Sequence, residues 1–343
     1  HYILSGQGET ATVRLEGKNG VRYTVPQQLD PHHMADSVTV RFRVGQPYQK
    51  AALCVYTDGK LLRRVPKRIL TPGEMEQFTL RREELDRLFA LPYTREVHPM
   101  YTEGIPAIEE VRFSITHNRG CFGGCNFCAI QLHQGRRVTS RSADSIVAEA
   151  ERMTHEPDFK GYIHDVGGPS ANFRHTSCQK QKKCGMCKNR SCLAPEPCPN
   201  LDADHSEYTE LLRKLRQLPG IKKVFVRSGI RYDYMLQDKN RDFFLELVQH
   251  HISGQLKVAP EHCVSSVLDY MGKPHFDVFL KFWRQYKKLN EQDGTEQYLV
   301  PYLMSSHPGC TLNDAVKLAE FLHKNGRTPE QVQDFYPTPG TLP

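Results

Sequence analysis

The stretch HNRGCFGGCNFCAI, residues 117–130, places three cysteines within eight residues, at Cys121, Cys125 and Cys128. Thiolates are ligands of zinc and of iron–sulfur clusters. A structural zinc site is normally closed by four ligands, whereas this stretch offers three thiols and no evident fourth. The stretch therefore predicts an open metal site, in which one position is left for another ligand.

Two kinds of site fit three cysteines at this spacing. A 4Fe–4S cluster held by three cysteines leaves one iron free, and that iron can chelate the amino and carboxylate groups of S-adenosylmethionine. The alternative is a zinc knuckle that borrows His117 or His133 as its fourth ligand. The flanking residues favour the cluster, because three neighbouring glycines let backbone amides approach its sulfurs. Phe127 is expected to cover the cluster and to face an adenine.

The composition is that of a globular chain with clustered cysteines. Of 343 residues, 38% are hydrophobic and 25% are charged, and 46 basic against 39 acidic residues give a net charge of +7. This mild surplus permits an anionic partner such as RNA without arguing for one. Eight of the eleven cysteines fall between Cys121 and Cys198. Such clusters indicate metal sites in a reducing compartment, here the cytoplasm. No apolar run approaches the length of a membrane span, so we expect no membrane partner.

The chain changes character along its length. Alternating and β-branched segments separated by turn signals predict a small antiparallel β module over residues 1–80. Residues 81–107 are expected to be a linker with one short helix. From residue 108 to 343, short apolar segments alternate with amphipathic ones. Strands are expected over residues 108–116, 161–168, 222–230, 254–262, 297–309 and 330–340, with helices between them.

Six strand–helix steps predict an α/β fold with a parallel sheet or barrel and right-handed crossovers. The active groups of such folds lie in the loops that follow the strands. The cysteine stretch follows the first expected strand, and it therefore lies at the functional end of the fold.

A second cysteine-rich segment, CQKQKKCGMCKNRSCLAPEPC, covers residues 178–198. It is polar and basic with little to bury, so a bound metal would supply the free energy that orders it. Zinc and an auxiliary iron–sulfur cluster both fit, and unligated reactive thiols are a third alternative. Cys178 is a spare beside a four-thiolate set made of Cys184, Cys187, Cys192 and Cys198.

The spacing C-x3-C-x-aromatic-C resembles the signature of the radical SAM superfamily. Further segments resemble the YgiQ-type radical SAM proteins, a bacterial family of uncharacterised function, from about residue 92 to the end of the chain. The resemblance implies a partial (β/α)6 TIM-type radical SAM barrel. It also implies a 4Fe–4S cluster, S-adenosylmethionine, a 5′-deoxyadenosyl radical, an unknown substrate and an electron donor such as flavodoxin or ferredoxin. The segments are RGCFGGCNFCAI, HQGRRVTSRS, FKGYIHDVGGPSANF, VRSGIRYDY, HHISGQLKVAPEH, QYLVPYLMSSHPGC and VQDFYPTPGT.

The resemblance assigns candidate positions for the cofactor. In radical SAM enzymes a glycine turn after the second strand binds the amino group of the cofactor, and Gly167 and Gly168 occupy that place. Pro169 replaces the usual acidic residue, so backbone carbonyls are expected to make the contact, and a simple tight turn is the alternative. Glu261, after the fourth strand, is expected to hydrogen-bond the ribose or methionyl part, with an exposed carboxylate as the alternative.

Polar residues near other strands complete the candidates. Ser228 and Arg231 follow the third strand and are expected to bind the cofactor, since an arginine can clamp a carboxylate in a bidentate pair. His164 and Asp165 on the second strand are candidate acid–base groups. Cys310, after the fifth strand, is either a hydrogen donor to a radical or a plain loop cysteine.

The front of the chain stands apart in sequence. Residues 1–80 do not match the YgiQ-type pattern and weakly resemble the tail of flavin-dependent oxidoreductases, so we expect a natural fusion or two joined reading frames. The chain begins at His1, without an initiator Met, so we also expect a fragment. The competing function is a non-catalytic metal-binding module for RNA or a protein partner, with both cysteine clusters as folding staples. Zinc in both sites would favour that module, and iron with sulfide in the first would favour the enzyme.

Overall fold

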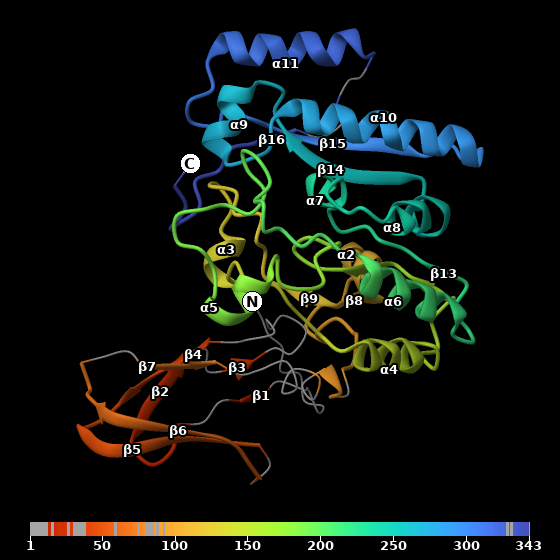
Figure 1. Ribbon diagram of the computed structural model, residues 1–343. Helices are drawn as coiled ribbons and strands as arrows, with labels where there is room; N and C mark the ends of the chain where they lie inside the picture. Colours follow the sequence, from red (N-terminus) through yellow and green to blue (C-terminus); the bar gives the residue numbers. More distant parts are fainter. Residues whose placement is uncertain are drawn as a thin grey trace. The chain divides into compact units, whose positions relative to one another are not determined.

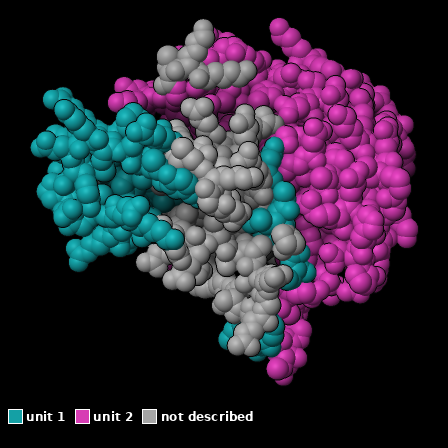
Figure 2. Space-filling model, turned by 90° about the horizontal axis from the view of Figure 1, so that it is seen from below, with its two compact units in different colours: residues 1–94, 98–100 teal, residues 95–97, 101–343 magenta. Residues whose placement is uncertain are grey.

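The computed structural model in Figure 1 describes residues 13–14, 17–25, 28–29, 39–57, 60–73, 76–79, 86, 89–91, 93–326, 329 and 332–342. It leaves out the side chains of residues 13–14, 25, 28–29, 39, 57, 60–63, 77–79 and 182–184. The chain divides into two compact units, residues 1–94 with 98–100 and residues 95–97 with 101–343, which Figure 2 shows in separate colours. The short helix expected in the linker lies largely outside the described residues. No helix in the described ranges combines the length and the apolar character that a membrane crossing requires.

The first unit is built from antiparallel strands, as its alternating sequence predicts. Its strands form a three-stranded sheet in the order β2-β4-β7 and two pairs, β1-β3 and β5-β6. Phe42 is the centre of a small apolar cluster that includes Val44 and Leu70. The bounds are Val13–Arg14 (β1), Val21–Val25 (β2), Gln28–Leu29 (β3), Thr39–Val44 (β4), Tyr48–Thr57 (β5), Lys60–Leu70 (β6) and Glu76–Thr79 (β7).

The second unit carries parallel strands, and β11 and β12 are two short pieces of one stretch of chain, residues 162–167. β12 pairs with β8, β11 with β13, and β15 with both β14 and β16, while a bridge from Ile230 to Val258 links the β13 segment to β14. Only β9 and β10, which flank the cysteine stretch, pair antiparallel among its described strands. The bounds are Ser114–Thr116 (β8), Asn118–Arg119 (β9), Thr139–Ser140 (β10), Tyr162–Ile163 (β11), Asp165–Gly167 (β12), Lys223–Val224 (β13), Gln255–Glu261 (β14), Tyr298–Ser305 (β15) and Gln333–Asp334 (β16).

Helices alternate with these strands, which confirms the predicted α/β class (Figure 1). The side chain of Ser142 caps α4, and Thr311 with Asp314 forms a capping box that starts α11. The bounds are Pro106–Val111 (α2), Ile130–His133 (α3), Ala143–Met153 (α4), Gln179–Cys184 (α5), Ser206–Gln217 (α6), Tyr232–Met235 (α7), Asp242–Glu246 (α8), Leu247–His251 (η1, a π-helix), Ser265–Met271 (α9), Phe276–Asp293 (α10) and Leu312–Lys324 (α11).

The strands expected over residues 222–230 and 330–340 are shorter than predicted, and the strand expected over residues 108–116 is partly wrong. Residues 106–111 form helix α2, and the strand that we expected over residues 108–116 is reduced to β8. Pro106 lies at the first position of the helix, where its missing N–H costs no hydrogen bond and its fixed φ suits helical backbone. The apolar side chains of the strands and helices then bury one large core, which includes Ile115, Ile163, Val166, Leu211, Leu215, Val224, Val258 and Phe282.

Candidate metal centre

The first cysteine loop lies between β9 and α3, and protein hydrogen bonds fix its path. The amide of Cys121 donates to the carbonyl of Gly135 at 3.0 Å. The amide of Asn126 donates to the carbonyl of Met271 at 2.9 Å, and its side chain donates to the carbonyl of Tyr270 at 2.8 Å. The loop is therefore tied to the end of α9, about 145 positions further along the chain.

The three thiols of this loop lie in one partly desolvated cluster. Burial raises the pKa of Cys121 and of Cys128, and the neighbouring thiol of Cys125 adds to both rises. The amide of Gly123 donates to the sulfur of Cys121, and the amide of Ile130 donates to the sulfur of Cys128. These two hydrogen bonds partly offset the rises in pKa. The Ser170 hydroxyl lies 3.6 Å from the sulfur of Cys121. Amides and hydroxyls that face thiolate sulfurs are typical of iron–sulfur sites.

The groups around these thiols favour a cluster over a single zinc ion. Among the described residues, no group of three histidine, cysteine, aspartate or glutamate side chains is placed to hold a metal ion. A 4Fe–4S cluster binds each thiolate to a different iron, so its ligands stand further apart than the ligands of one zinc ion. His117 is engaged elsewhere, since its Nε2 lies 2.8 Å from the carbonyl of Ala171. The residues present fit the cluster better than a zinc knuckle.

A buried arginine supplies positive charge beside the thiols. The Nη1 of Arg231 lies 3.5 Å from the sulfur of Cys125, and its Nε donates to Asp233 at 2.8 Å. Burial alone would lower the pKa of the Arg231 guanidinium, but the Asp233 carboxylate raises it well above its usual value. Gly123 makes room for this guanidinium, because a Cβ there would lie 2.2 Å from its Nη1. The cysteine loop and Arg231 therefore fit closely together.

A second buried cation, Lys273, follows the helix to which the loop is tied. Its Nζ donates to the carbonyl of Ala259 at 2.6 Å and lies 3.8 Å from a carboxylate oxygen of Glu261. Its charge also acts to lower the pKa of Cys128. Burial raises the pKa of Glu261, although the charges of Lys273 and Arg231 oppose the rise. Glu261 is thus buried at this site, with a left-handed φ of 69° that non-glycine residues rarely adopt.

A chain of hydrogen bonds orients the Arg231 backbone. Asn172 accepts from the Arg231 amide at 2.8 Å and donates to the Arg231 carbonyl at 3.1 Å. The same Asn172 amide lies 3.1 Å from Nε2 of His205, whose Nδ1 lies 2.7 Å from Asp238. Burial lowers the pKa of His205, so the neutral ring donates to Asp238 through Nδ1 and accepts from Asn172 through Nε2. This network is structural support for Arg231.

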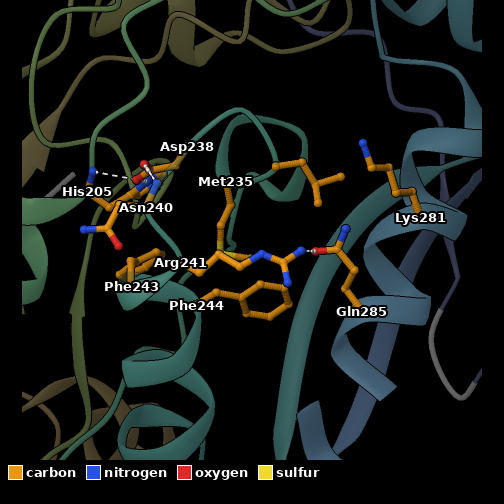
Figure 3. Close-up of a pocket in the computed structure, with 10 residues that line it drawn as sticks. His205, Met235, Asp238, Asn240, Arg241, Phe243, Phe244, Lys281 and Gln285 are labelled. Atoms are coloured by element: carbon orange, nitrogen blue, oxygen red, sulfur yellow. Dashed lines mark hydrogen bonds and ion pairs between the residues drawn. The ribbon is translucent and has the colours of Figure 1, made fainter. Parts of the chain in front are cut away.

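His205 and Asp238 also line a pocket of about 180 Å³, shown in Figure 3. Arg241 reaches across it to Gln285, to which its guanidinium donates at 2.9 Å, and Phe243 stacks on the His205 ring at 4.6 Å. No cysteine is among its lining residues. The pocket is connected to the thiols through the Asn172 bonds to Arg231 and through Tyr234, which contacts both His205 and Phe122. The cysteine loop remains the better candidate site.

The expected glycine turn is present and closely packed. A Cβ at Gly167 would lie 2.1 Å from the Ser228 hydroxyl, and a Cβ at Gly168 would lie 1.6 Å from Oδ1 of Asn118. Asp165 accepts the amides of Arg227 and Ser228 at 2.8 Å and 3.1 Å, and also the Ser228 hydroxyl. The structure thus brings Asp165, Gly167 and Ser228 together, with Asp165 fastening the turn after β13.

The remaining candidates fall into two places. The ring of His164 packs edge-on against Phe113, with centroids 6.4 Å apart. Asp165, the next residue, contacts Ser228 instead. Phe127 and Cys310 both pack on the apolar cluster of Met271 and Met304. The sulfur of Cys310 lies 3.8 Å from Nε2 of His262. Phe127 and Cys310 are therefore brought together on one side of the loop, and His164 is not.

The second cysteine segment begins in α5. The side chain of Cys184 lies outside the described residues, so the predicted set of Cys184, Cys187, Cys192 and Cys198 stays a prediction. The structure does relate Cys178, the expected spare, to Cys192, since the thiols of Cys178 and Cys198 both act on the pKa of Cys192.

Sequence reasoning missed several supporting residues of the site. Lys273, Asn172 and His205 lie far from Arg231 in sequence and only folding brings them near it, whereas Asp233 and Asp238 lie a few positions after it. Asp233, two positions after Arg231, was the one local signal available, because an arginine and an aspartate at the start of one short helix can pair.

Comparison with known proteins finds two consecutive family models on the chain. A family model described as the Radical SAM superfamily matches residues 115–322, over half of the chain. A second model, Radical SAM N-terminal, matches residues 30–114. The expectation that the front segment lies outside the family is therefore wrong from residue 30 onward. Its strands carry a common alternation and no chemical motif, so their pattern alone did not reveal their family.

Curated relatives extend well into the first unit. A UPF0313 protein of Clostridium perfringens (strain SM101 / Type A) is 60% identical over 315 residues, which cover 91% of this chain and 46% of the relative. A UPF0313 protein of Clostridium botulinum (strain Okra / Type B1) is 57% identical over 286 residues, which cover 83% and 44%. The chain thus spans about half the length of the curated relatives it matches. It belongs to the radical SAM superfamily and, within it, to the YgiQ-type UPF0313 family.

Solved structures are more distant. The radical S-adenosylmethionine methyltransferase TsrM from Kitasatospora setae is 15% identical, with a TM-score of 0.41, and the match covers 65% of this chain and 35% of that chain. The cobalamin-dependent S-adenosylmethionine radical enzyme OxsB is 13% identical, with a TM-score of 0.41 and coverages of 67% and 28%. A likeness of this degree implies nothing about the substrate of this chain.

Proposed function

We propose that this chain is the core of a radical SAM enzyme with a partial (β/α)6 barrel, acting on an unidentified substrate. The three thiols of the first loop, backed by the Arg231 cation, are the observation that carries the proposal. When bound, a 4Fe–4S cluster supplies the electron that cleaves S-adenosylmethionine into methionine and a 5′-deoxyadenosyl radical. The residues position the cofactor and shield it.

Each residue has a separate task in this proposal. Cys121, Cys125 and Cys128 hold the cluster, and the buried charges of Arg231 and Lys273 compensate the negative charge of its thiolates. Their desolvated positions make that compensation stronger than it would be in water.

The cofactor side of the site is built from the strand ends. The backbone at Gly167 and Gly168 faces the amino group of S-adenosylmethionine, and Phe127 covers its adenine. Glu261 and Ser228 are the candidate hydrogen-bond partners of the rest of the molecule. Asp165 keeps Ser228 in place, since it accepts from both the amide and the hydroxyl of that residue.

The substrate side is less defined. Cys310 is a candidate hydrogen donor, because its thiol packs on the same apolar cluster as Phe127. His164 and Asp165 remain the acid–base candidates. We place the protein in the reducing cytoplasm, with flavodoxin or ferredoxin as the donor of electrons. The cysteines whose side chains are described are all unpaired, which suits that compartment.

Anaerobic reconstitution with iron and sulfide, followed by reductive cleavage of S-adenosylmethionine, tests the proposal. We expect 5′-deoxyadenosine from the intact chain and none from Cys125→Ala. Cys54→Ala, at a cysteine in the first unit, is the matched control and should behave as the intact chain. A chain that holds its full iron and binds S-adenosylmethionine but forms no 5′-deoxyadenosine would contradict the proposal. Zinc in place of iron would favour the metal-binding module.

A further inference from the structure

The second cysteine segment repeats the surroundings of the first. The sulfur of Cys192 lies 3.3 Å from the Ser177 hydroxyl, as that of Cys121 lies 3.6 Å from Ser170. An arginine charge acts on each of these thiols, Arg136 on Cys192 and Arg231 on Cys121. A buried sulfur, a serine hydroxyl and an arginine thus occur together twice in one chain.

Backbone bonds bring three cysteines of the segment to one place. The amide of Cys198 donates to the carbonyl of Cys192 at 3.0 Å. Cys178 directly follows Ser177, whose hydroxyl is the one that contacts the sulfur of Cys192. The amide of Asp202 donates to the Ser177 carbonyl at 2.8 Å and closes the segment on itself. Cys178, Cys192 and Cys198 are therefore neighbours, although 20 positions of chain separate the outer two.

The two cysteine segments lie next to each other. The rings of Phe122 and Phe173 stack with centroids 3.8 Å apart, and this stack belongs to an apolar cluster that contains Cys192 and has Cys121 packed against it. Arg136 connects the same two segments through its side chain. Its guanidinium donates to the carbonyls of Cys187 and Arg190 at 3.1 Å and 3.0 Å, and its Nε would lie 3.6 Å from a Cβ at Gly124.

We propose that Cys178, Cys192 and Cys198 bind a second iron–sulfur cluster, separated from the first by the Phe122 and Phe173 stack. The serine hydroxyl and the arginine beside Cys192 repeat the surroundings of the first loop, and this favours a cluster over a zinc ion. Lys188 and Arg190 between these cysteines are exposed, while Leu193 is buried beside Cys192, so a bound cluster would add to packing that the segment already has. The second cluster adds to the proposed function and does not depend on the cleavage of S-adenosylmethionine.

The test removes the first site and measures what remains. After anaerobic reconstitution, the intact chain should hold roughly eight irons, and the triple variant Cys121→Ala, Cys125→Ala, Cys128→Ala roughly four with matching sulfide. Dithionite should give that variant the electron paramagnetic resonance signal of a reduced cluster. The triple variant Cys178→Ala, Cys192→Ala, Cys198→Ala should lose this second set of irons and keep the first.

The single variant Cys178→Ser decides the matter if a triple variant fails to fold, with Cys54→Ser as its control. Loss of about half of the iron from Cys178→Ser alone supports the second cluster. Unchanged iron and spectrum in Cys178→Ser, or one zinc ion in the first-loop triple variant, would overturn it. Because iron and spectrum are the readouts, this result is separate from the formation of 5′-deoxyadenosine, which tests the proposed function.

Discussion

The two cysteine loops, residues 121–128 and 178–198, surround their thiols with similar groups and differ in what holds the backbone. The first loop is tied by its own amides to Gly135 and Met271, and a buried ion pair of Arg231 and Asp233 lies against it. In the second loop, the carbonyls of Cys187 and Arg190 are held by one side chain, that of Arg136. The first loop is therefore held by its own amides beside a buried ion pair, whereas residues 187–190 of the second loop are held by an arginine side chain.

This difference teaches where the folding free energy of each site comes from. Hydrogen bonds and a close fit around Gly123 preorganise the first loop, which suits a site that must hold a reactive cofactor in one geometry. In the second loop, the cluster that we propose would contribute its binding free energy to the order of the chain. Substitutions of the residues that contact the first loop should therefore change its stability most when no metal is present.

The largest effect is expected from Arg231→Gln. The substitution leaves the Asp233 carboxylate buried without its partner, which costs about 3–5 kcal/mol. Urea unfolding of the metal-free chain measures that loss. Arg227→Gln is the matched control, because its guanidinium is 40% exposed and lies 3.9 Å from the exposed Glu110, so its loss should stay below about 1 kcal/mol. Equal losses in both variants would show that the buried ion pair does not shape the loop.

Gly123→Ala should have the next largest effect. The added Cβ would lie 2.2 Å from Nη1 of Arg231 and 3.2 Å from the sulfur of Cys121, so the guanidinium or the loop must move. Overpacking of this kind costs about 1–3 kcal/mol and should lower the iron retained after reconstitution. Gly229→Ala is the control, since a Cβ there meets nothing within 4 Å. If Gly123→Ala retains as much iron as Gly229→Ala, the close fit is not needed for the cluster.

A smaller, local effect is expected from Arg136→Gln. Its two hydrogen bonds, one of them exposed to solvent, hold the loop around the exposed Lys188 and Arg190. Trypsin should then cleave the metal-free loop several-fold faster than in the intact chain, because cleavage follows the open population. Arg137→Gln, at the exposed neighbouring arginine, should leave the rate unchanged. No change in Arg136→Gln would mean that the loop is held by other contacts.

The sequence allowed the first loop to be predicted because its chemistry is local. Three cysteines and their glycines lie within a few positions, so spacing alone indicates the site. The alternating strands and helices after residue 112 follow from periodicity in the same way. Periodicity did not predict the structure of residues 106–111, because an apolar segment with charges fits a strand or a short helix. The proline at its start favours the helix.

The supporting shell escaped prediction for a physical reason. Lys273 and Asn172 reach the site through long-range packing, and their side chains are ordinary in any local window of sequence. Which thiols of the second loop lie together was harder still to predict, since spacing does not tell which of five thiols meet. Their arrangement depends on the backbone hydrogen bond from the Cys198 amide to the Cys192 carbonyl and on the position of Ser177.

The smallest expected effect concerns Glu261 and pH. Burial raises the folded pKa of this carboxyl above its ordinary value of 4.5, so between those two values the folded chain binds more protons than the unfolded chain. The contribution of Glu261 to stability is therefore lost as pH rises through that window, and Glu261→Gln removes the loss. Urea unfolding between pH 4 and about 7.5 should show the variant gaining on the intact chain as pH rises, with Glu296→Gln as an exposed control. A gain on lowering the pH instead would mean that Lys273 and Arg231 outweigh burial, and that Glu261 is held as a carboxylate at the first loop.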